Sequence, residues 1–283
     1  MTVPARDSEA TLVLIHPIGN DIGSWDFVGL DHAKRFEFPG HGERPRQSDF
    51  TQADLADMVA SEFEGPLDIV GMSMGGAVVA NLLVRHPERI RSAVVICSGS
   101  IAVANLTPQM LEKRIETMRA RADLSKNGME GVLADTMPRW FTPWALRTDQ
   151  PGVRYARETL LKMDPKAWYD VWNCQGISEA LTIDAIKAIE QPVTIVGGIN
   201  DFASGLRGLT DLHEMVQDSR FEIMPISHMA HLEHPEFVRA AIDRHFAWAP
   251  IGQRVEAPMG SSVWLTVEDN WIADHTNQRS ESK

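Results

Sequence analysis

The stretch Leu67-Asp68-Ile69-Val70-Gly71-Met72-Ser73-Met74-Gly75-Gly76 decides the fold expected for this chain. Its first half reads as a short buried strand, and residues 74–85 continue it as a helix. Between them lies Gly-x-Ser-x-Gly, a pattern typical of a sharp strand-to-helix turn that exposes a serine at the edge of a parallel sheet. Gly71 and Gly75 fit this turn because side chains there would obstruct neighbouring elements. The stretch predicts a nucleophile at Ser73, and a glycine-rich turn without chemistry is the alternative that the motif alone leaves open.

The chain around this turn alternates between predicted strands and helices. Apolar runs predict strands at residues 11–15, 34–38, 90–97, 192–196 and 221–224. Helical spacing of apolar residues predicts helices over 54–64, 206–216 and 235–248. Such alternation indicates a parallel sheet with right-handed crossovers. We therefore predict an α/β fold with a mostly parallel central sheet and helices on both faces.

The alternation is interrupted between residues 106 and 189, where apolar residues follow helical spacing and no buried strand is predicted. We interpret this segment as a helical lid inserted between two strands, and expect its tryptophans, Trp140, Trp144, Trp168 and Trp172, to pack between lid and core. The predicted division is a first core part over residues 1–105, the lid over 106–189, a second core part over 190–248 and a C-terminal extension over 249–283. In the extension, alternation over residues 263–267 favours a short strand.

The composition is that of a soluble globular protein, with 43% hydrophobic and 23% charged residues. A net charge of −12 argues against nucleic acid or an anionic membrane as a partner, but it leaves open a small anionic substrate in a locally basic pocket. Two cysteines do not make a disulfide framework. Residues 1–10 are polar, unlike a signal peptide, and no apolar run approaches the ~20 residues that span a bilayer. A cytoplasmic protein is expected, and nothing in the sequence indicates an oligomeric state.

A serine nucleophile needs a base that takes its proton and a carboxylate that orients this base. Asp201 follows the next-to-last predicted strand, and His228 follows the last. Both would then meet Ser73 at the carboxyl ends of parallel strands, which is where open sheets bind ligands. We therefore predict a catalytic triad of Ser73, Asp201 and His228. Two alternatives remain, namely Asp201 as a helix cap and His231 as the base.

The other histidines are interpreted as structural. His16 and His41 lie in turn-rich loops after predicted strands, where a ring commonly holds the backbone by hydrogen bonds. The group His228, His231 and His234 also resembles a metal site, but the sequence has no second cluster of ligands. It also lacks a phosphate-binding loop and a dinucleotide-binding glycine motif in context. We therefore predict no metal and no cofactor.

The negatively charged oxygen of a tetrahedral intermediate needs preorganised N–H donors. We assign them to the backbone of Met74, which follows the serine, and of Ile18, in the loop after the first strand. Three side chains are assigned to substrate binding from their positions in that loop and in the lid, and they are Trp25, Arg139 and Trp140.

With these residues identified, the chain resembles the α/β-hydrolase superfamily over about residues 12–245. The segments that carry the resemblance are His-Pro-Ile-Gly at 16–19, Phe-Pro-Gly-His-Gly at 38–42, the stretch 71–76, Gly-Ile-Asn-Asp at 198–201 and residues 228–236. Within the superfamily the lid is most similar to that of 3-oxoadipate enol-lactonases, through Gly-Val-Leu-Ala at 131–134, Arg-Trp-Phe-Thr-Pro at 139–143 and Leu-Leu-Lys-Met-Asp-Pro at 160–165, with Asp-Phe-Ala at 201–203. Residues 167–174 and the C-terminal extension depart from that family.

The resemblance implies hydrolysis of an ester, which in the enol-lactonases is a lactone of aromatic catabolism. We therefore expect a carboxylic ester hydrolase or lactonase that acts through an acyl-enzyme on a small, carboxylate-bearing substrate. C–C bond hydrolases, amidases and perhydrolases use the same triad, and fold alone does not separate them. The alternative from another class is a ligand-binding receptor built on a hydrolase scaffold.

Overall fold

A computed structural model of the chain describes residues 3–98, 107–177 and 181–250. At its centre is a six-stranded sheet in the order β2-β1-β3-β4-β5-β6. In that order the strands span Lys34–Phe36, Thr11–Ile15, Leu67–Met72, Ile90–Ile96, Val193–Asn200 and Ser219–Ser227. Every neighbouring pair is parallel. The predicted α/β fold is confirmed, and each strand lies where the sequence predicted one.

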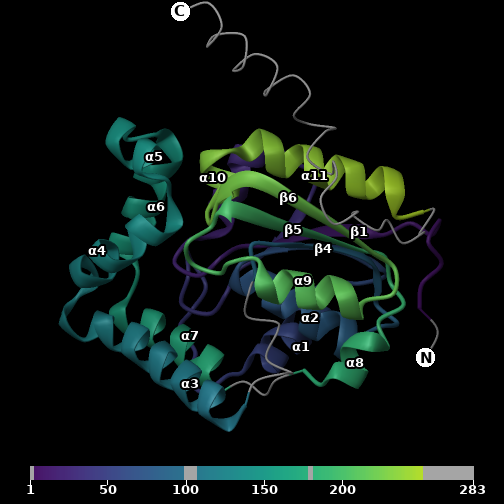
Figure 1. Cartoon of the computed structure of the whole chain (residues 1–283), viewed down its shortest axis with the longest axis horizontal. Helices are drawn as coiled ribbons and strands as arrows, with labels where there is room; N and C mark the ends of the chain where they lie inside the picture. Colours follow the sequence, from purple (N-terminus) through teal and green to yellow (C-terminus); the bar gives the residue numbers. More distant parts are fainter. Residues whose placement is uncertain (1–2, 99–106, 178–180, 251–283) are drawn as a thin grey trace, which may run out of the picture.

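Helices cover both faces of the sheet (Figure 1). One face carries α1 (Gln52–Glu62), α2 (Met74–Arg85) and α9 (Arg207–Met215), and the other carries α11 (Pro235–Trp248) with the 3₁₀ helix η1 (Ile22–Val28). A hydrophobic core lies on each face of the sheet. Side chains of successive β1 residues point into one core and then the other, with Val13 and Ile15 on the α2 side and Leu14 on the α11 side. Burial on both faces explains why the strands read as continuous apolar runs.

The last two strands run past the ends expected from the sequence. β5 continues to Asn200 and β6 to Ser227, and these two residues pair across the sheet. Pro225 has no N–H to donate, but β6 is an edge strand, where a missing donor costs no ladder hydrogen bond. Asp201 and His228 therefore follow directly at neighbouring strand ends.

Helices occupy the chain between β4 and β5, where the sequence predicted a lid. They are α3 (Pro108–Asp123), the 3₁₀ helix η3 (Leu124–Asn127), α4 (Met129–Trp140), α5 (Pro143–Thr148), α6 (Pro151–Lys162), α7 (Pro165–Ile177) and α8 (Ile183–Lys187). Several begin at a proline, whose fixed φ suits the first helical position and whose missing N–H loses no helical bond there. Figure 1 shows α3 to α7 together beyond the end of the sheet at which α10 (Ala230–Glu233) lies.

The tryptophans of these helices do not all pack inward. Trp140, Trp168 and Trp172 are buried, as expected, but Trp144 is 54% exposed. The reason is local, because the short helix α5 packs through Ala145, which leaves the neighbouring indole on its outer side.

Parts of the predicted organisation lie outside the described residues. These are residues 99–106, where the lid was predicted to begin, residues 178–180 within it, and residues 251–283 of the extension with their predicted strand. Over the ranges that the structure does describe, none of the helices has the length and apolar character needed to cross a bilayer.

Candidate active site

Ser73 stands at the turn between β3 and α2 in a conformation that most residues avoid. Its φ is 53° and its ψ is −117°, and such a backbone costs on the order of 1–3 kcal/mol. Neighbouring elements hold it in place, because the Ser73 N–H donates to the carbonyl of Ile96 on β4 at 2.9 Å and the Ser73 carbonyl accepts from Ala77 of α2 at 3.2 Å. This strained turn is the one predicted from the glycine-rich motif.

The flanking glycines allow three elements to approach closely at this turn. A Cβ at Gly75 would lie 2.3 Å from the carbonyl oxygen of Ile15 on β1, and a Cβ at Gly71 would lie 2.3 Å from the carbonyl oxygen of Gly75. Both contacts are with backbone atoms, which cannot rotate away as the end of a side chain can. The motif therefore fixes the distance from the serine to the loop that follows β1.

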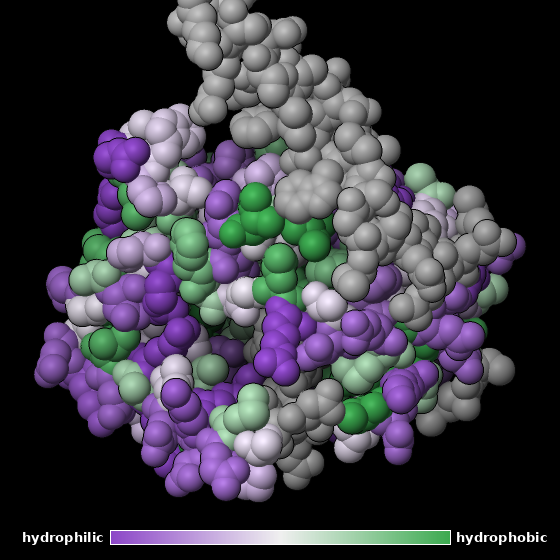
Figure 2. Space-filling model, in the orientation of Figure 1, coloured by the Kyte–Doolittle hydropathy of each residue, from purple (hydrophilic) through white to green (hydrophobic). Residues whose placement is uncertain are grey.

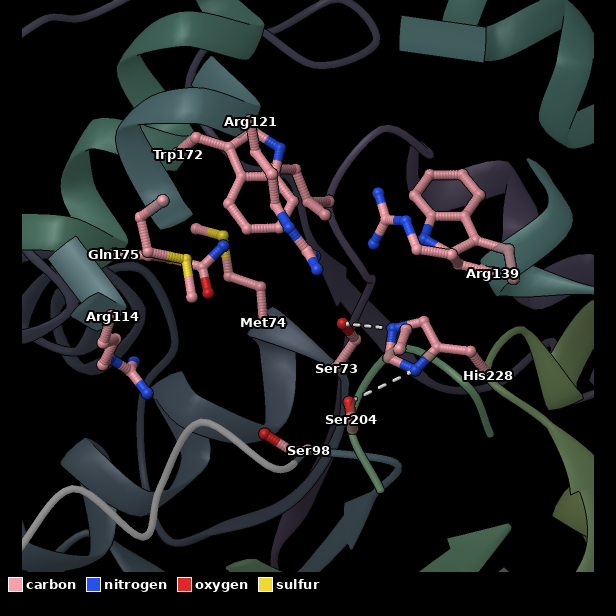
Figure 3. Close-up of a pocket in the computed structure, with 14 residues that line it drawn as sticks. Ser73, Met74, Ser98, Arg114, Arg121, Arg139, Trp172, Gln175, Ser204 and His228 are labelled. Carbon is pink, nitrogen blue, oxygen red and sulfur yellow. Dashed lines mark hydrogen bonds between the residues drawn. The ribbon is translucent and has the colours of Figure 1, made fainter. Parts of the chain in front are cut away.

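Ser73, His228 and Asp201 form one chain of hydrogen bonds. His228 Nε2 lies 2.8 Å from Ser73 Oγ (Figure 3), and His228 Nδ1 lies 3.0 Å from each carboxylate oxygen of Asp201. The histidine can therefore take the serine proton on one nitrogen while the carboxylate orients the other. The structure thus brings together the three residues that the sequence singled out.

The Asp201 carboxylate is held in its ionised form. Burial alone raises the pKa of a carboxyl group, but the charge and hydrogen bond of the neighbouring His228, together with two backbone hydrogen bonds, outweigh it, so that the pKa of Asp201 is lowered. The two backbone donors are the N–H groups of Ala203 and Ser204, each of which donates to Asp201 Oδ1 at 2.9 Å. Asp201 can therefore stabilise a positive charge on the histidine at neutral pH.

His231, the alternative base, does not reach the serine. Its ring is fully buried, and neither ring nitrogen has a hydrogen-bond partner among the described residues. Over those residues the structure also groups no three histidine, cysteine or acidic side chains that could hold a metal ion. His228 is the histidine that contacts Ser73, as the sequence predicted.

Two buried histidines fix the loop that carries Ile18. His16 Nε2 accepts a hydrogen bond from the N–H of Phe38, and His41 Nε2 accepts one from the N–H of Gly19, each at 3.1 Å. Nδ1 of each ring faces a backbone carbonyl oxygen, at 2.8 Å and 3.2 Å. Each ring therefore carries its proton on Nδ1 and is neutral. The structural role predicted for both histidines is confirmed.

Acid pH is expected to unfold the chain through four buried histidines. Burial lowers the pKa of His16 to about 4, and that of His41, His231 and His245 to about 3. In the unfolded chain their pKa lies near ~6.5. Between these values the unfolded state binds protons that the folded state excludes, so stability falls as the pH falls. Each ring contributes up to about 1.4 kcal/mol per pH unit to this loss.

Urea unfolding measured between pH 7 and pH 4.5 tests this expectation. The midpoint should fall steeply below pH ~6. His245→Gln should make that dependence shallower, because His245 is buried and does not line the pocket. His32→Gln is the control, since His32 is exposed. A midpoint that does not change between pH 6.5 and pH 5 would contradict the assignment of neutral buried rings.

A cavity of about 180 Å³ opens above Ser73 and His228. In Figure 2 the surface is hollowed between the lid side of the molecule and the core. Predicted site residues line the cavity, namely Ile18, Ser73, Met74, Arg139, Trp140 and His228, while Asp201 lies behind His228. Met74 is the first residue of α2, where backbone N–H groups have no partner within the helix. The Met74 N–H is therefore available for an anion at the serine.

Trp25 does not line this cavity, which corrects its assignment to substrate binding. Its side chain is fully buried in the core on the α11 side of the sheet, with its ring centroid 5.2 Å from that of His231. The loop after β1 turns into η1, and this short helix packs against α11. Position in the loop alone did not indicate which way the indole faces.

Other pocket residues were not identified from the sequence. Arg114, Met118 and Arg121 enter from α3, and Trp172 and Gln175 enter from α7. The spacing of the α3 residues by four and three positions puts them on one face of the helix. That spacing is visible in the sequence, but apolar periodicity alone assigns arginines to the solvent side.

A buried carboxylate ties the lid to the segment that follows β6. Glu233 of α10 accepts hydrogen bonds from the N–H of Thr142 at 3.1 Å, from the Thr142 hydroxyl, and from the Ser227 hydroxyl at 2.6 Å. Nearby, the N–H of Met229 donates to the carbonyl of Trp140 at 3.1 Å. The pocket wall from α4 is thus attached to the segment that positions the histidine.

Comparison with known proteins agrees with this geometry. A family model described as "Alpha/beta hydrolase family" matches residues 12–241. A pimeloyl-[acyl-carrier protein] methyl ester esterase of Chromobacterium violaceum is 26% identical, over 81% of this chain and 91% of that protein. The esterase of the same name from Neisseria meningitidis is 27% identical, over 74% of this chain and 80% of that protein.

The fold is shared with solved structures of low sequence identity. The enol-lactonase of Burkholderia xenovorans has a TM-score of 0.71 at 19% identity, over 87% of this chain and 94% of its own. The family model covers most of the chain, including the serine turn, both later strand ends and the helices between them. The chain therefore belongs to the alpha/beta hydrolase family.

Proposed function

We propose that this chain is a carboxylic ester hydrolase that forms an acyl-enzyme on Ser73. The observation that carries the proposal is the chain of hydrogen bonds from Ser73 through His228 to Asp201 at the base of a cavity. The relatives named methyl ester esterases support an ester as the bond that is cleaved. A receptor would need neither the strained serine turn nor a base in contact with it.

In the proposed first step Ser73 Oγ attacks the ester carbonyl while His228 Nε2 takes the serine proton. Asp201 holds the ring and balances the positive charge that it gains. The carbonyl oxygen becomes an anion, which the backbone N–H groups of Met74 and Ile18 bind. His228 then gives its proton to the leaving alcohol, and the acyl group stays on the serine.

The second step repeats the first with water as the nucleophile. His228 takes a proton from water, and the resulting hydroxide attacks the acyl-enzyme carbonyl. The same two N–H groups bind the second oxyanion. As it collapses, the bond to Ser73 Oγ breaks, the serine regains its proton from the histidine, and the free acid leaves.

The proposed substrate is an ester or lactone of a small acid that bears a carboxylate. Arg114, Arg121 and Arg139 line the cavity, and among the described residues no aspartate or glutamate lines it. Such a surface favours a negatively charged ligand. The enol-lactone implied by the sequence resemblance belongs to this class, and so does the methyl ester of a dicarboxylic acid.

A substrate panel tests the proposal. The purified protein is assayed with methyl esters, aryl esters and enol-lactones, and with an amide and a vinylogous diketone of similar size. We expect kcat/KM for the best ester or lactone to exceed that for the amide and the diketone by at least about 10²-fold. Turnover of the amide or diketone in preference to every ester would overturn the bond class. Tight binding without any product would favour the receptor.

A further inference from the structure

Two arginines on one face of α3 bring positive charge into the pocket. Arg114 and Arg121 line it together with Met118, which lies between them on the helix. Seven residues of α-helix span about 10 Å, so the two side chains leave the helix well apart. In Figure 3 the guanidinium of Arg121 points toward the space above Ser73, whereas that of Arg114 lies on the side of Ser98.

Among the described residues, 3–98, 107–177 and 181–250, neither of these arginines has an ion-pair partner. Arg121 lies over the ring of Trp172, with its guanidinium carbon 5.1 Å from the ring centroid. Burial lowers the pKa of both arginines, but a guanidinium remains protonated in proteins. Within the described part of the chain, the pocket therefore contains two partly buried charges that form no ion pair, although Asp135 lies near enough to Arg121 to raise its pKa in part.

Arg139, which the sequence analysis assigned to substrate binding, is already paired. Its guanidinium forms an ion pair with the carboxylate of Asp135, and its Nε donates to the Asp135 carbonyl at 3.1 Å. Arg139 is close enough to Arg121 to lower the pKa of the latter further. In Figure 3 these two guanidinium groups face each other across the space above Ser73, and Arg114 stands apart. The pocket thus has one cationic end beside the serine and a second at Arg114.

An unpaired charge that is removed from water destabilises the protein unless a ligand of opposite charge binds to it. The chain as a whole has a net charge of −12, so these cations do not belong to a generally basic surface. They would be expected to attract an anion into the cavity and to hold it there. Because the two cationic ends of the pocket lie apart, we expect a ligand that matches both of them to carry two separate anionic groups.

We propose that the substrate carries two anionic groups, one next to the scissile carbonyl, bound by Arg121, and a second at the far end of the pocket, bound by Arg114. Met118 would contact the apolar carbons that join them. The inference rests on the proposed hydrolysis at Ser73, because the serine defines which end of the pocket is near. Carboxylates and phosphates share the required chemistry, since both accept paired N–H bonds from a guanidinium.

Four esters that share the same leaving group and differ in the charge of the acyl part test the inference. One is neutral, one carries a carboxylate beside the ester, one adds a distal carboxylate, and one carries a phosphate in place of the distal carboxylate. We expect kcat/KM to rise from the neutral ester to the dianions. The ratio of the last two esters tells whether Arg114 prefers a carboxylate or a phosphate.

Variants that remove one positive charge at a time show which arginine binds which anionic group of the substrate. Arg114→Gln should lower kcat/KM for the preferred dianion by about 10- to 150-fold, to the level of the monoanion, because it removes a hydrogen bond between charged groups. Arg121→Gln should lower it for every charged ester. In both variants the loss on the neutral ester should be smaller than the loss on the charged esters, because the neutral ester has no anionic group for either arginine to bind. Arg119→Gln is the matched control, since Arg119 is an exposed residue of the same helix, and all four esters should be unaffected.

Two results would overturn the inference. One is a wild-type preference for the neutral ester. The other is an equal loss on all four esters in Arg114→Gln, which would indicate a structural role. If no ester is hydrolysed at all, the proposed function fails, and calorimetry decides the inference separately. The intact wild-type chain should then bind a tricarboxylate more tightly than its neutral triester, and Arg114→Gln should reduce the difference, since Arg121 still binds one anionic group. Equal binding of both compounds would overturn it.

Discussion

Ser73→Ala is expected to lower kcat/KM for the best ester by on the order of 10⁴-fold or more. Without Oγ no acyl-enzyme can form, and His228 has only water to activate. The fold should persist, because the hydrogen bonds that hold this turn come from the backbone of residue 73. Steady-state kinetics on the purified variant, with its melting temperature measured alongside, checks both parts of the prediction.

The control for this variant is Ser61→Ala. Ser61 is an exposed serine on α1, and its hydroxyl donates only within that helix, to the carbonyl of Met58. It should retain full activity. Substantial turnover in Ser73→Ala, at a melting temperature equal to that of the wild type, would remove Ser73 from the mechanism.

Gly75→Ala is expected to destabilise the chain by at least about 2 kcal/mol and to abolish most activity. The added Cβ would meet the backbone oxygen of Ile15 at 2.3 Å, so β1 and α2 must move apart. That movement shifts Ile18, after β1, relative to Met74, at the start of α2. The two proposed oxyanion donors would then no longer converge on one oxygen.

Urea unfolding of Gly75→Ala beside Gly131→Ala separates this clash from the general effect of adding a methyl group. At Gly131, inside α4, the nearest atom that a new Cβ would meet outside the helix is the Leu124 carbonyl oxygen, at 3.6 Å. Alanine there should be neutral or stabilise by up to about 1 kcal/mol, because alanine is the better helix former. Equal stability of Gly75→Ala and the wild type would show that the close approach of β1 and α2 is not required.

The triad could be predicted from the sequence because each of its residues follows a strand. Local apolar runs identify the strands, and parallel pairing brings their carboxyl ends to one edge. The order serine, acid, histidine then leaves few candidates, and Ser73, Asp201 and His228 meet within hydrogen-bond distance. The choice between His228 and His231 likewise followed from distance to the strand end.

The pocket wall could not be predicted in the same way. Trp25 follows the loop next to the site, but it belongs to η1, which directs its indole into the core on the α11 side. Arg114 and Arg121 look like solvent-facing residues of an amphipathic helix until α3 is placed over the serine. Which face of a lid helix meets the core depends on tertiary packing, which neither spacing nor propensity encodes.

The C-terminal end of β5 was also predicted too short, because Gly197-Gly198 reads as a turn, and so was that of β6, because Pro225 reads as a strand terminator. Its position on an edge strand is a property of the sheet order, which a single strand does not reveal. The strand itself was recognised, so the placement of His228 was unaffected by the error.

The most direct test of the central claim, that Ser73 carries the acyl group, is covalent trapping with an alkyl fluorophosphonate. In this reaction a serine oxygen bonds to phosphorus and fluoride leaves. Intact mass spectrometry should show a single adduct, and peptide mapping should place it on Ser73. His228→Ala should slow its formation by at least about 10²-fold, because the base that activates the serine is gone. An adduct on another residue, or full ester turnover by protein labelled at Ser73, would contradict the account.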